Sequence, residues 1–163
     1  LPASSTSLLD PHWPIYTLSE DRPPARFGAT ASVDNCIVAN GCRVFGRVEN
    51  SILFPGVLVG EGSVVSDSIL FSGVQVYRHC NVSRCIVDKQ AVLGDGVAIG
   101  SLTPVAHNLG RVQSGERIVS TEEGLTVIGK NTRIPAGFEC RRPLMIDSHL
   151  NEDAVRQAAS LVY

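Results

Sequence analysis

A six-residue repetition of aliphatic residues runs from about Val33 to Gly100 and constrains the fold more than any other feature of the sequence. One series steps by six, at Ile52, Leu58, Val64, Leu70, Val76 and Val82. A neighbouring series holds Leu53, Val59, Val65 and Phe71, and after a slip of one residue the repetition resumes at Val87, Leu93 and Ile99. A period of six does not match the 3.6 residues of a helical turn, so the repetition excludes an α-helix here.

Turn-forming residues separate the aliphatic positions, in the pairs Asn40-Gly41, Pro55-Gly56, Glu61-Gly62, Ser72-Gly73 and Asp95-Gly96. Val and Ile favour strands, whereas Gly, Asn and Asp tolerate the positive φ that tight corners require. The pattern therefore predicts short strands joined by corners, with three hexads closing one triangular coil. Successive coils would stack about 4.8 Å apart, and the aliphatic residue of each hexad would point inward.

The predicted fold class is all-β, a parallel β-helix of hexapeptide repeats with a short C-terminal helix. Residues 1–30 are rich in Pro and non-repetitive, which predicts a linker or arm. The β-helix is predicted over 31–150, with a loop excursion at 101–126, where the repetition stops. Residues 151–163 are predicted to form a helix with Asn151 as its N-cap, which would close the open end of the stack.

Composition argues against several classes of partner. The chain has 16 acidic and 14 basic residues and a formal charge of −2, which argues against nucleic acid or a membrane surface. No apolar stretch approaches the roughly 20 residues of a membrane span. The five cysteines are odd in number and lack a C-x-x-C pair, which favours small buried residues in a reducing cytoplasm over a metal site. The chain begins without Met, which suggests a piece of a longer protein or a processed chain.

No catalytic residue is predicted, because the sequence holds no G-x-S-x-G, H-E-x-x-H or Walker pattern. A hexapeptide-repeat acyltransferase, which would need a His as general base, remains an alternative, with His107 and His79 as its candidates. No metal or cofactor site is predicted in this chain.

Basic residues at corners are the candidate binding groups. Arg78, Arg84 and Lys89 fall on successive corners, and Lys130 and Arg133 lie near the last coil. Stacking of the coils can bring some of these side chains onto one edge, where they would form an anion site. The alternative is ordinary solubilising charge on outward positions.

Four segments resemble the C-terminal part of bacterial glucose-1-phosphate adenylyltransferase (ADP-glucose pyrophosphorylase). His12 to Thr17 followed by Pro23 to Phe27 resembles that family's linker, and Glu49 to Val57 resembles its first β-helix coil. Arg84 to Lys89 resembles its I-D-K/R motif, and Glu122 to Lys130 resembles its closing E-G-x-x-x-V segment. Together these similarities extend over nearly the whole chain.

The resemblance implies a left-handed β-helix that supports assembly of a cytoplasmic homotetramer and helps to bind a phosphorylated metabolite or nucleotide effector. Lys89 and Lys130 are the effector-binding residues that the resemblance suggests, and Arg84 joins them as a basic residue on a neighbouring corner. The reaction, in which ATP and glucose 1-phosphate give ADP-glucose and pyrophosphate for glycogen synthesis, would belong to a catalytic domain with bound Mg²⁺, which this chain lacks. The longer C-terminal tail leaves open a non-catalytic regulatory paralogue, and a purely structural β-helix is a further alternative.

Overall fold

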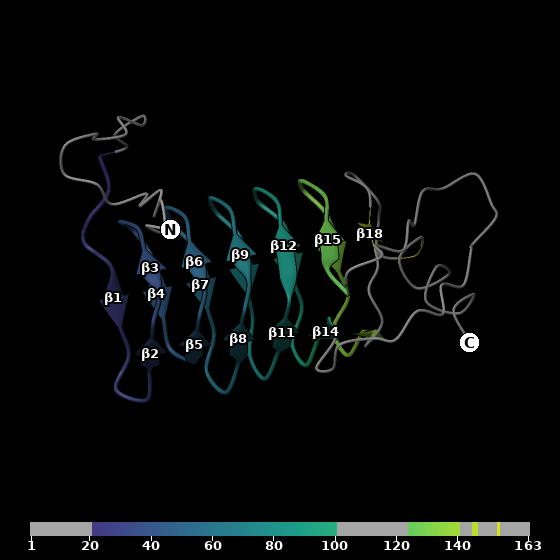
Figure 1. The fold of residues 1–163 in the computed structure, drawn as a ribbon, viewed down its shortest axis with the longest axis horizontal. Helices are drawn as coiled ribbons and strands as arrows, with labels where there is room; N and C mark the ends of the chain where they lie inside the picture. Colours follow the sequence, from purple (N-terminus) through teal and green to yellow (C-terminus); the bar gives the residue numbers. More distant parts are fainter. Residues whose placement is uncertain (1–20, 101–123, 141–144, 147–152, 154–163) are drawn as a thin grey trace, which may run out of the picture.

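The chain folds into a solenoid of stacked triangular coils, and the computed structural model describes its residues 21–100, 124–140, 145–146 and 153. Its strands are two or three residues long and form three parallel sheets of six strands each (Figure 1). The first sheet contains β1 Arg26–Phe27, β4 Arg43–Val44, β7 Leu58–Val59, β10 Gln75–Val76, β13 Val92–Leu93 and β16 Arg133–Ile134. The second contains β2 Ser32–Asp34, β5 Arg47–Glu49, β8 Val64–Ser66, β11 Asn81–Ser83, β14 Ala98–Ile99 and β17 Glu139–Cys140. The third contains β3 Ile37–Val38, β6 Ile52–Leu53, β9 Ile69–Leu70, β12 Cys85–Val87, β15 Thr126–Ile128 and β18 Met145–Ile146.

This architecture confirms the predicted fold class, a left-handed parallel β-helix of hexapeptide repeats. The solenoid begins with β1, inside the segment predicted as a linker. Most of the predicted excursion, at 101–123, lies outside the described residues, and the chain re-enters the stack at β15. The predicted C-terminal helix over 151–163 also lies outside them, apart from Asp153, which is helical.

The coils repeat every seventeen residues over most of the stack. Leu53 pairs with Leu70, and Leu70 pairs with Val87, each seventeen residues further along. Within a coil, the inward positions are separated by six, six and five residues. The core therefore follows the series Leu53, Val59, Val65, Leu70, Val76, Val82, Val87, Leu93 and Ile99, in which every side chain is at most 2% exposed.

The prediction that Ile52, Leu58 and Val64 point inward is wrong. These residues are half-buried, because they precede the core residue of their strand and therefore lie on the opposite face. The six-residue series crosses from the outer to the inner face between Val64 and Leu70, where the chain takes a step of five. Both faces of these strands are aliphatic, so the period alone did not reveal the crossing.

Three rows of corners join the sheets, and each row forms one edge of the solenoid. The upper edge in Figure 1 joins the third sheet to the first, at residues 39–42, 54–57, 71–74, 88–91 and 129–132. The lower edge joins the first sheet to the second, at 28–31, 45–46, 60–63, 77–80, 94–97 and 135–138. The front edge joins the second sheet to the third, through Asn35, Asn50, Asp67 and Arg84, all with φ between 47° and 52°.

Each edge repeats one backbone conformation from coil to coil. On the upper edge the left-handed position is held by Gly41, Gly56 and Gly73, and then by Gln90 and Asn131, with φ of 59° and 60°. On the front edge side chains bond along the stack, because Asn35 donates to Asn50 at 2.8 Å and Asn50 donates to Asp67 at 3.3 Å.

One corner of the lower edge is two residues shorter than its neighbours. Only Phe45 and Gly46 separate β4 from β5, whereas four residues separate β7 from β8 and four separate β10 from β11. The next coil therefore projects past this corner, which leaves a hollow in the surface.

Candidate functional site

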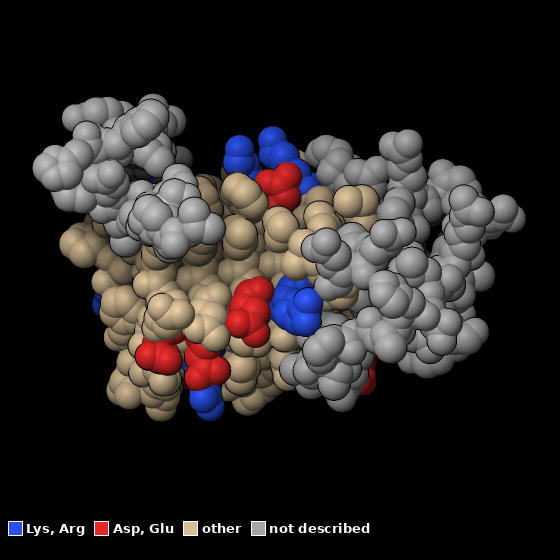
Figure 2. Space-filling model, viewed as in Figure 1, with Lys and Arg blue, Asp and Glu red and all other residues tan. Residues whose placement is uncertain are grey.

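Lys89 and Lys130 occupy the same position on consecutive coils of the upper edge. The backbone N–H of Asn131 donates to the carbonyl oxygen of Lys89 at 3.0 Å, which sets the two corners in register. Both lysine side chains are exposed, and within the described ranges neither ammonium forms an ion pair. Figure 2 shows basic side chains gathered on this edge above β12, with an acidic side chain among them. The structure thus brings together two of the three predicted effector-binding residues.

Arg84, the third, lies on a different edge. It occupies the front edge in line with Asp67, one corner before Lys89 along the chain. Arg78 lies on the lower edge, so the three successive corner residues Arg78, Arg84 and Lys89 point from three different edges. Two further basic residues lie near the upper edge, of which Arg133 was among the predicted candidates and Arg22 was missed. Arg22 lies over Gly41 and Gly56 at its N-terminal end, and Arg133 follows Lys130 on the first sheet.

The outer face of the third sheet is continuously aliphatic. Its outward column runs, through paired residues, along Ile37, Ile52, Ile69, Ile86, Val127 and Met145. The corresponding column of the first sheet contains three arginines, Arg26, Arg43 and Arg133, so the aliphatic column distinguishes the third sheet. Where Figure 2 shows this face, over β9 and β12, the side chains are uncharged. A sheet face in contact with water usually carries polar residues. This apolar face therefore has the composition of a surface that another part of a protein covers.

A pair of aromatic rings joins this aliphatic face to the upper edge. Phe54 and Phe71 hold equivalent positions on consecutive coils, with ring centroids 4.8 Å apart and planes 18° apart. Phe54 is nevertheless 38% exposed. The apolar face therefore continues to the edge that carries Lys89 and Lys130, further along the stack.

The described part of the chain contains one of the two histidines that were candidates for acyl transfer. The ring of His79 packs over Gly62 on the lower edge, and His107 lies outside the described residues. In the described ranges no group of three or more His, Cys, Asp and Glu side chains could hold a metal ion. The same ranges contain no helix with the length and hydropathy of a membrane span.

The buried cysteines are core residues rather than nucleophiles. Cys85 is fully buried and donates from its sulfur to the carbonyl oxygen of Ser83 at 3.2 Å. Its backbone N–H donates to the hydroxyl of Ser68 at 3.1 Å, in a column of small polar residues inside the front edge. Burial raises the pKa of the Cys85 thiol to about 12, and burial also raises the pKa of Cys42 and of Cys80. A neutral thiol is a poor nucleophile and metal ligand.

We expect alkaline pH to destabilise the fold through Cys85. Because its pKa is about 12 in the folded chain and about 9.0 when unfolded, the folded state binds more protons between these values. The free energy of unfolding should therefore be unaffected by this group below pH 9 and should fall as the pH rises towards 12. Urea titrations at several pH values test this, with Cys85→Ala as the comparison. A Cys85→Ala variant with an equally steep alkaline decline would contradict the assignment.

Comparison with known proteins connects this geometry to a family. Residues 23–128 match the family model described as GlmU-like, C-terminal hexapeptide. The chain belongs to this hexapeptide-repeat family. It is also 32% identical over 147 residues to glucose-1-phosphate adenylyltransferase of Acetivibrio thermocellus, covering 90% of this chain and 33% of the relative. The enzyme of the same name from Shewanella oneidensis is 34% identical over 146 residues, covering 85% of this chain and 33% of the relative.

The glucose-1-phosphate adenylyltransferase of Desulforamulus reducens is 38% identical over 93 residues, covering 57% of this chain and 23% of the relative. These similarities confirm the predicted resemblance to the C-terminal region of that enzyme family. The chain spans about a third of the length of the first relatives that it matches.

Proposed function

We propose that this chain is the assembly and allosteric-regulatory β-helix of a glucose-1-phosphate adenylyltransferase. In that protein ATP and glucose 1-phosphate would give ADP-glucose and pyrophosphate, the step that feeds glycogen synthesis. The chemistry, with its Mg²⁺, would take place in a catalytic domain corresponding to the remaining two thirds of the relatives. The names of those relatives, and the third of their length that the chain covers, support the assignment to this enzyme.

The observation that carries the regulatory part is the stacked pair Lys89 and Lys130. Their corners are adjacent along the stack, so two exposed positive charges start from backbone positions about 5 Å apart. Two like charges held about 5 Å apart would repel by roughly 1 kcal/mol in water, although the long lysine side chains allow the ammonium groups to move further apart. An anion with several oxygens, such as a phosphate group, relieves this repulsion and accepts hydrogen bonds from both ammonium groups. A phosphorylated metabolite or a nucleotide has this chemistry.

The aliphatic face of the third sheet supports docking of another domain of the same protein. Five intervals of about 4.8 Å make this column roughly 24 Å long, and a stripe one residue wide offers only a few hundred Å². That is less than the roughly 800 Å² per partner of a stable interface between separate proteins. A domain of the same polypeptide has a high effective concentration and needs less area. We therefore assign this face to the protein's own catalytic domain, while sister subunits complete a cytoplasmic homotetramer through other contacts.

Lys89 and Lys130 lie next to this face, so an anion bound to them could affect how the catalytic domain docks. The upper edge borders the third sheet, and Phe54 and Phe71 belong to both surfaces. An effector bound at Lys89 and Lys130 would thus lie beside the docked domain. It can change the balance between two domain arrangements only if it contacts one of them better than the other.

We expect Lys89→Ala with Lys130→Ala to weaken anion binding at least tenfold. Each charge-assisted hydrogen bond contributes about 1.5–3 kcal/mol, and a tenfold change corresponds to about 1.4 kcal/mol. Calorimetric titration of this chain with sulfate, sugar phosphates and nucleotides measures the affinity. Arg43→Ala is the matched control, because Arg43 is also exposed but lies on the first sheet. Unchanged affinity in Lys89→Ala would remove Lys89 from the site, and no binding by any anion would favour a purely structural β-helix.

A further inference from the structure

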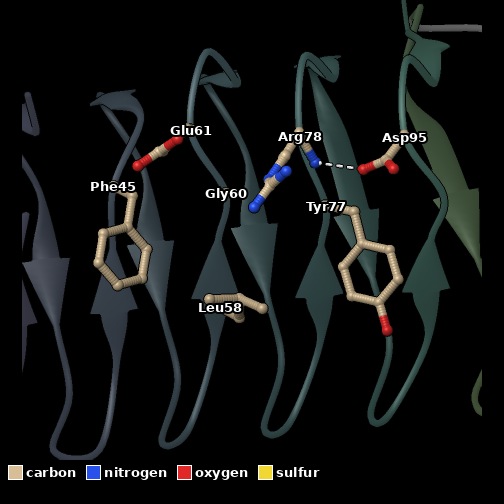
Figure 3. A pocket seen from close by; sticks show the side chains of 7 residues that line it. All are labelled: Phe45, Leu58, Gly60, Glu61, Tyr77, Arg78 and Asp95. Atoms are coloured by element: carbon tan, nitrogen blue, oxygen red, sulfur yellow. Dashed lines mark hydrogen bonds between the residues drawn. The ribbon is translucent and has the colours of Figure 1, made fainter.

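The hollow beside the short corner is lined by two aromatic rings, an aliphatic floor and three charged residues. Its volume is about 410 Å³, and it is lined by Phe45, Leu58, Gly60, Glu61, Tyr77, Arg78 and Asp95. Figure 3 shows the rings of Phe45 and Tyr77 on either side of Leu58, with the charged side chains along one border. This surface belongs to the first sheet and the lower edge, so it is separate from Lys89 and Lys130 on the upper edge.

The hollow follows from local sequence. On the lower edge, the residue after each strand of the first sheet alternates between Gly and a ring, in the order Gly28, Phe45, Gly60, Tyr77, Gly94 and Pro135. At Gly60 a Cβ atom would lie 2.6 Å from the carbonyl oxygen of Tyr77, so Gly60 contributes only backbone to the floor beside Leu58. The corner that contains Phe45 and Gly46 is two residues shorter than the next one. The preceding coil therefore has no corner residue in register with Glu61.

The two aromatic rings face the hollow from different coils. Phe45 and Tyr77 belong to coils on either side of the one that contributes Leu58 and Gly60, so they are two coil spacings apart, or roughly 10 Å along the stack. That spacing is too wide for one flat ring sandwiched between two others, but it allows a thicker or longer ligand to pack on one ring and reach the other. Tyr77 is 40% exposed, which leaves its ring accessible.

Three charged residues form one border of the hollow. Glu61 and Asp95 contribute two negative charges and Arg78 one positive charge, giving a net charge of −1 from these three residues. Asp95 is already engaged, because it accepts a hydrogen bond from the backbone N–H of Arg78 at 2.8 Å. Glu61 and Arg78 form no ion pair within the described ranges. In Figure 3 the Arg78 side chain extends over Gly60, and the Glu61 carboxylate extends towards Phe45.

We infer that this hollow binds a neutral saccharide. A pyranose has an apolar face of C–H groups that packs on an aromatic ring, and a border of hydroxyl groups that both donate and accept hydrogen bonds. Here Phe45 or Tyr77 receives the apolar face, the Glu61 carboxylate accepts from one hydroxyl, and the Arg78 guanidinium donates to another. The net negative border disfavours a sugar phosphate or a nucleotide, so this ligand class differs from the one assigned to the upper edge.

The experiment uses maltotriose and cellotriose as neutral probes and glucose 6-phosphate as the charged comparison. Amide chemical shifts of the ¹⁵N-labelled chain locate and quantify binding, with a dissociation constant on the order of 1 mM expected for a shallow site. A neutral trisaccharide should shift the amides of Gly60, Glu61 and Tyr77, and glucose 6-phosphate should shift them less at equal concentration and low salt.

Variants of the exposed lining residues identify the contacts. Tyr77→Ala and Glu61→Ala should each weaken trisaccharide binding at least fivefold, whereas Tyr77→Phe should retain affinity within twofold because the ring face is kept. Phe71→Ala is the control for loss of an aromatic ring outside the hollow, and the amide spectrum of each variant verifies its fold. The inference is overturned if no trisaccharide shifts these amides at tens of millimolar, if Tyr77→Ala binds like the wild type, or if glucose 6-phosphate binds here more tightly than the neutral probes.

Discussion

Leu70→Ala is expected to lower the free energy of unfolding by about 2–5 kcal/mol, whereas Ile69→Ala should lower it by less than about 1 kcal/mol. Leu70 is fully buried and stacks between Leu53 and Val87, so truncation leaves a cavity in the middle of the column. Ile69 is the preceding residue of the same strand and points outward, where it is half-buried. Urea titration of the two variants measures the difference.

A second pair tests the same register one coil earlier. Leu53 is buried and Ile52 is half-buried, although the six-residue series placed Ile52 in line with Leu70. Leu53→Ala should therefore resemble Leu70→Ala, and Ile52→Ala should resemble Ile69→Ala. Equal losses in Ile52→Ala and Leu53→Ala would contradict the inward series that the structure assigns.

Gly46→Ala is expected to destabilise the chain by about 3 kcal/mol, through steric overlap at the short corner. A Cβ atom at Gly46 would lie 2.3 Å from the carbonyl oxygen of Ser63 and 2.8 Å from that of Gly60, and both are backbone atoms of the next coil. The coils would have to separate here, which would also weaken the 2.8 Å hydrogen bond from the Arg47 N–H to Ser63.

Gly137→Ala is the matched control for this overlap. Gly137 has a φ of 70° and no atom within 4 Å of an added Cβ, so its substitution costs only the strain of the left-handed conformation, about 1 kcal/mol. Denaturant titrations of both variants separate overlap from strain. A Gly46→Ala variant no less stable than Gly137→Ala would show that the short corner is not tightly packed against its neighbour.

The sequence predicted the class of fold because each coil repeats its residue types where the coil conformation repeats. The pairs Asn40-Gly41, Pro55-Gly56 and Ser72-Gly73 mark one edge directly, since their glycines adopt positive φ. The face of each strand was harder to predict. Ile52 and Leu53 are equally apolar, so only the steps of five residues distinguish the core from the outer face, and one of these steps was missed.

The candidate sites were predictable to different degrees. Lys89 and Lys130 follow the end of equivalent strands, and the resemblance already selected both residues. Arg84 was grouped with them because it also lies at a corner. Its corner belongs to the front edge, however, and the residue spacing did not show which edge each corner belongs to. The short corner beside the hollow could have been predicted from the sequence. The inward residues Val44 and Val48 are only four residues apart, whereas the repetition has six at this point of the coil. The aliphatic column of the third sheet was hidden in the series that was assigned to the core.

The most direct test of the regulatory role uses the full-length protein that contains this chain. ADP-glucose formation is measured against the concentration of the phosphorylated ligand that binds the wild type, in the wild type, in the Lys89→Ala and Lys130→Ala double variant, and in Arg43→Ala. The account predicts that the ligand changes the rate of the wild type and of Arg43→Ala, and that this response is lost in the double variant. A double variant that responds to the ligand at the same concentration and to the same extent as the wild type would contradict it.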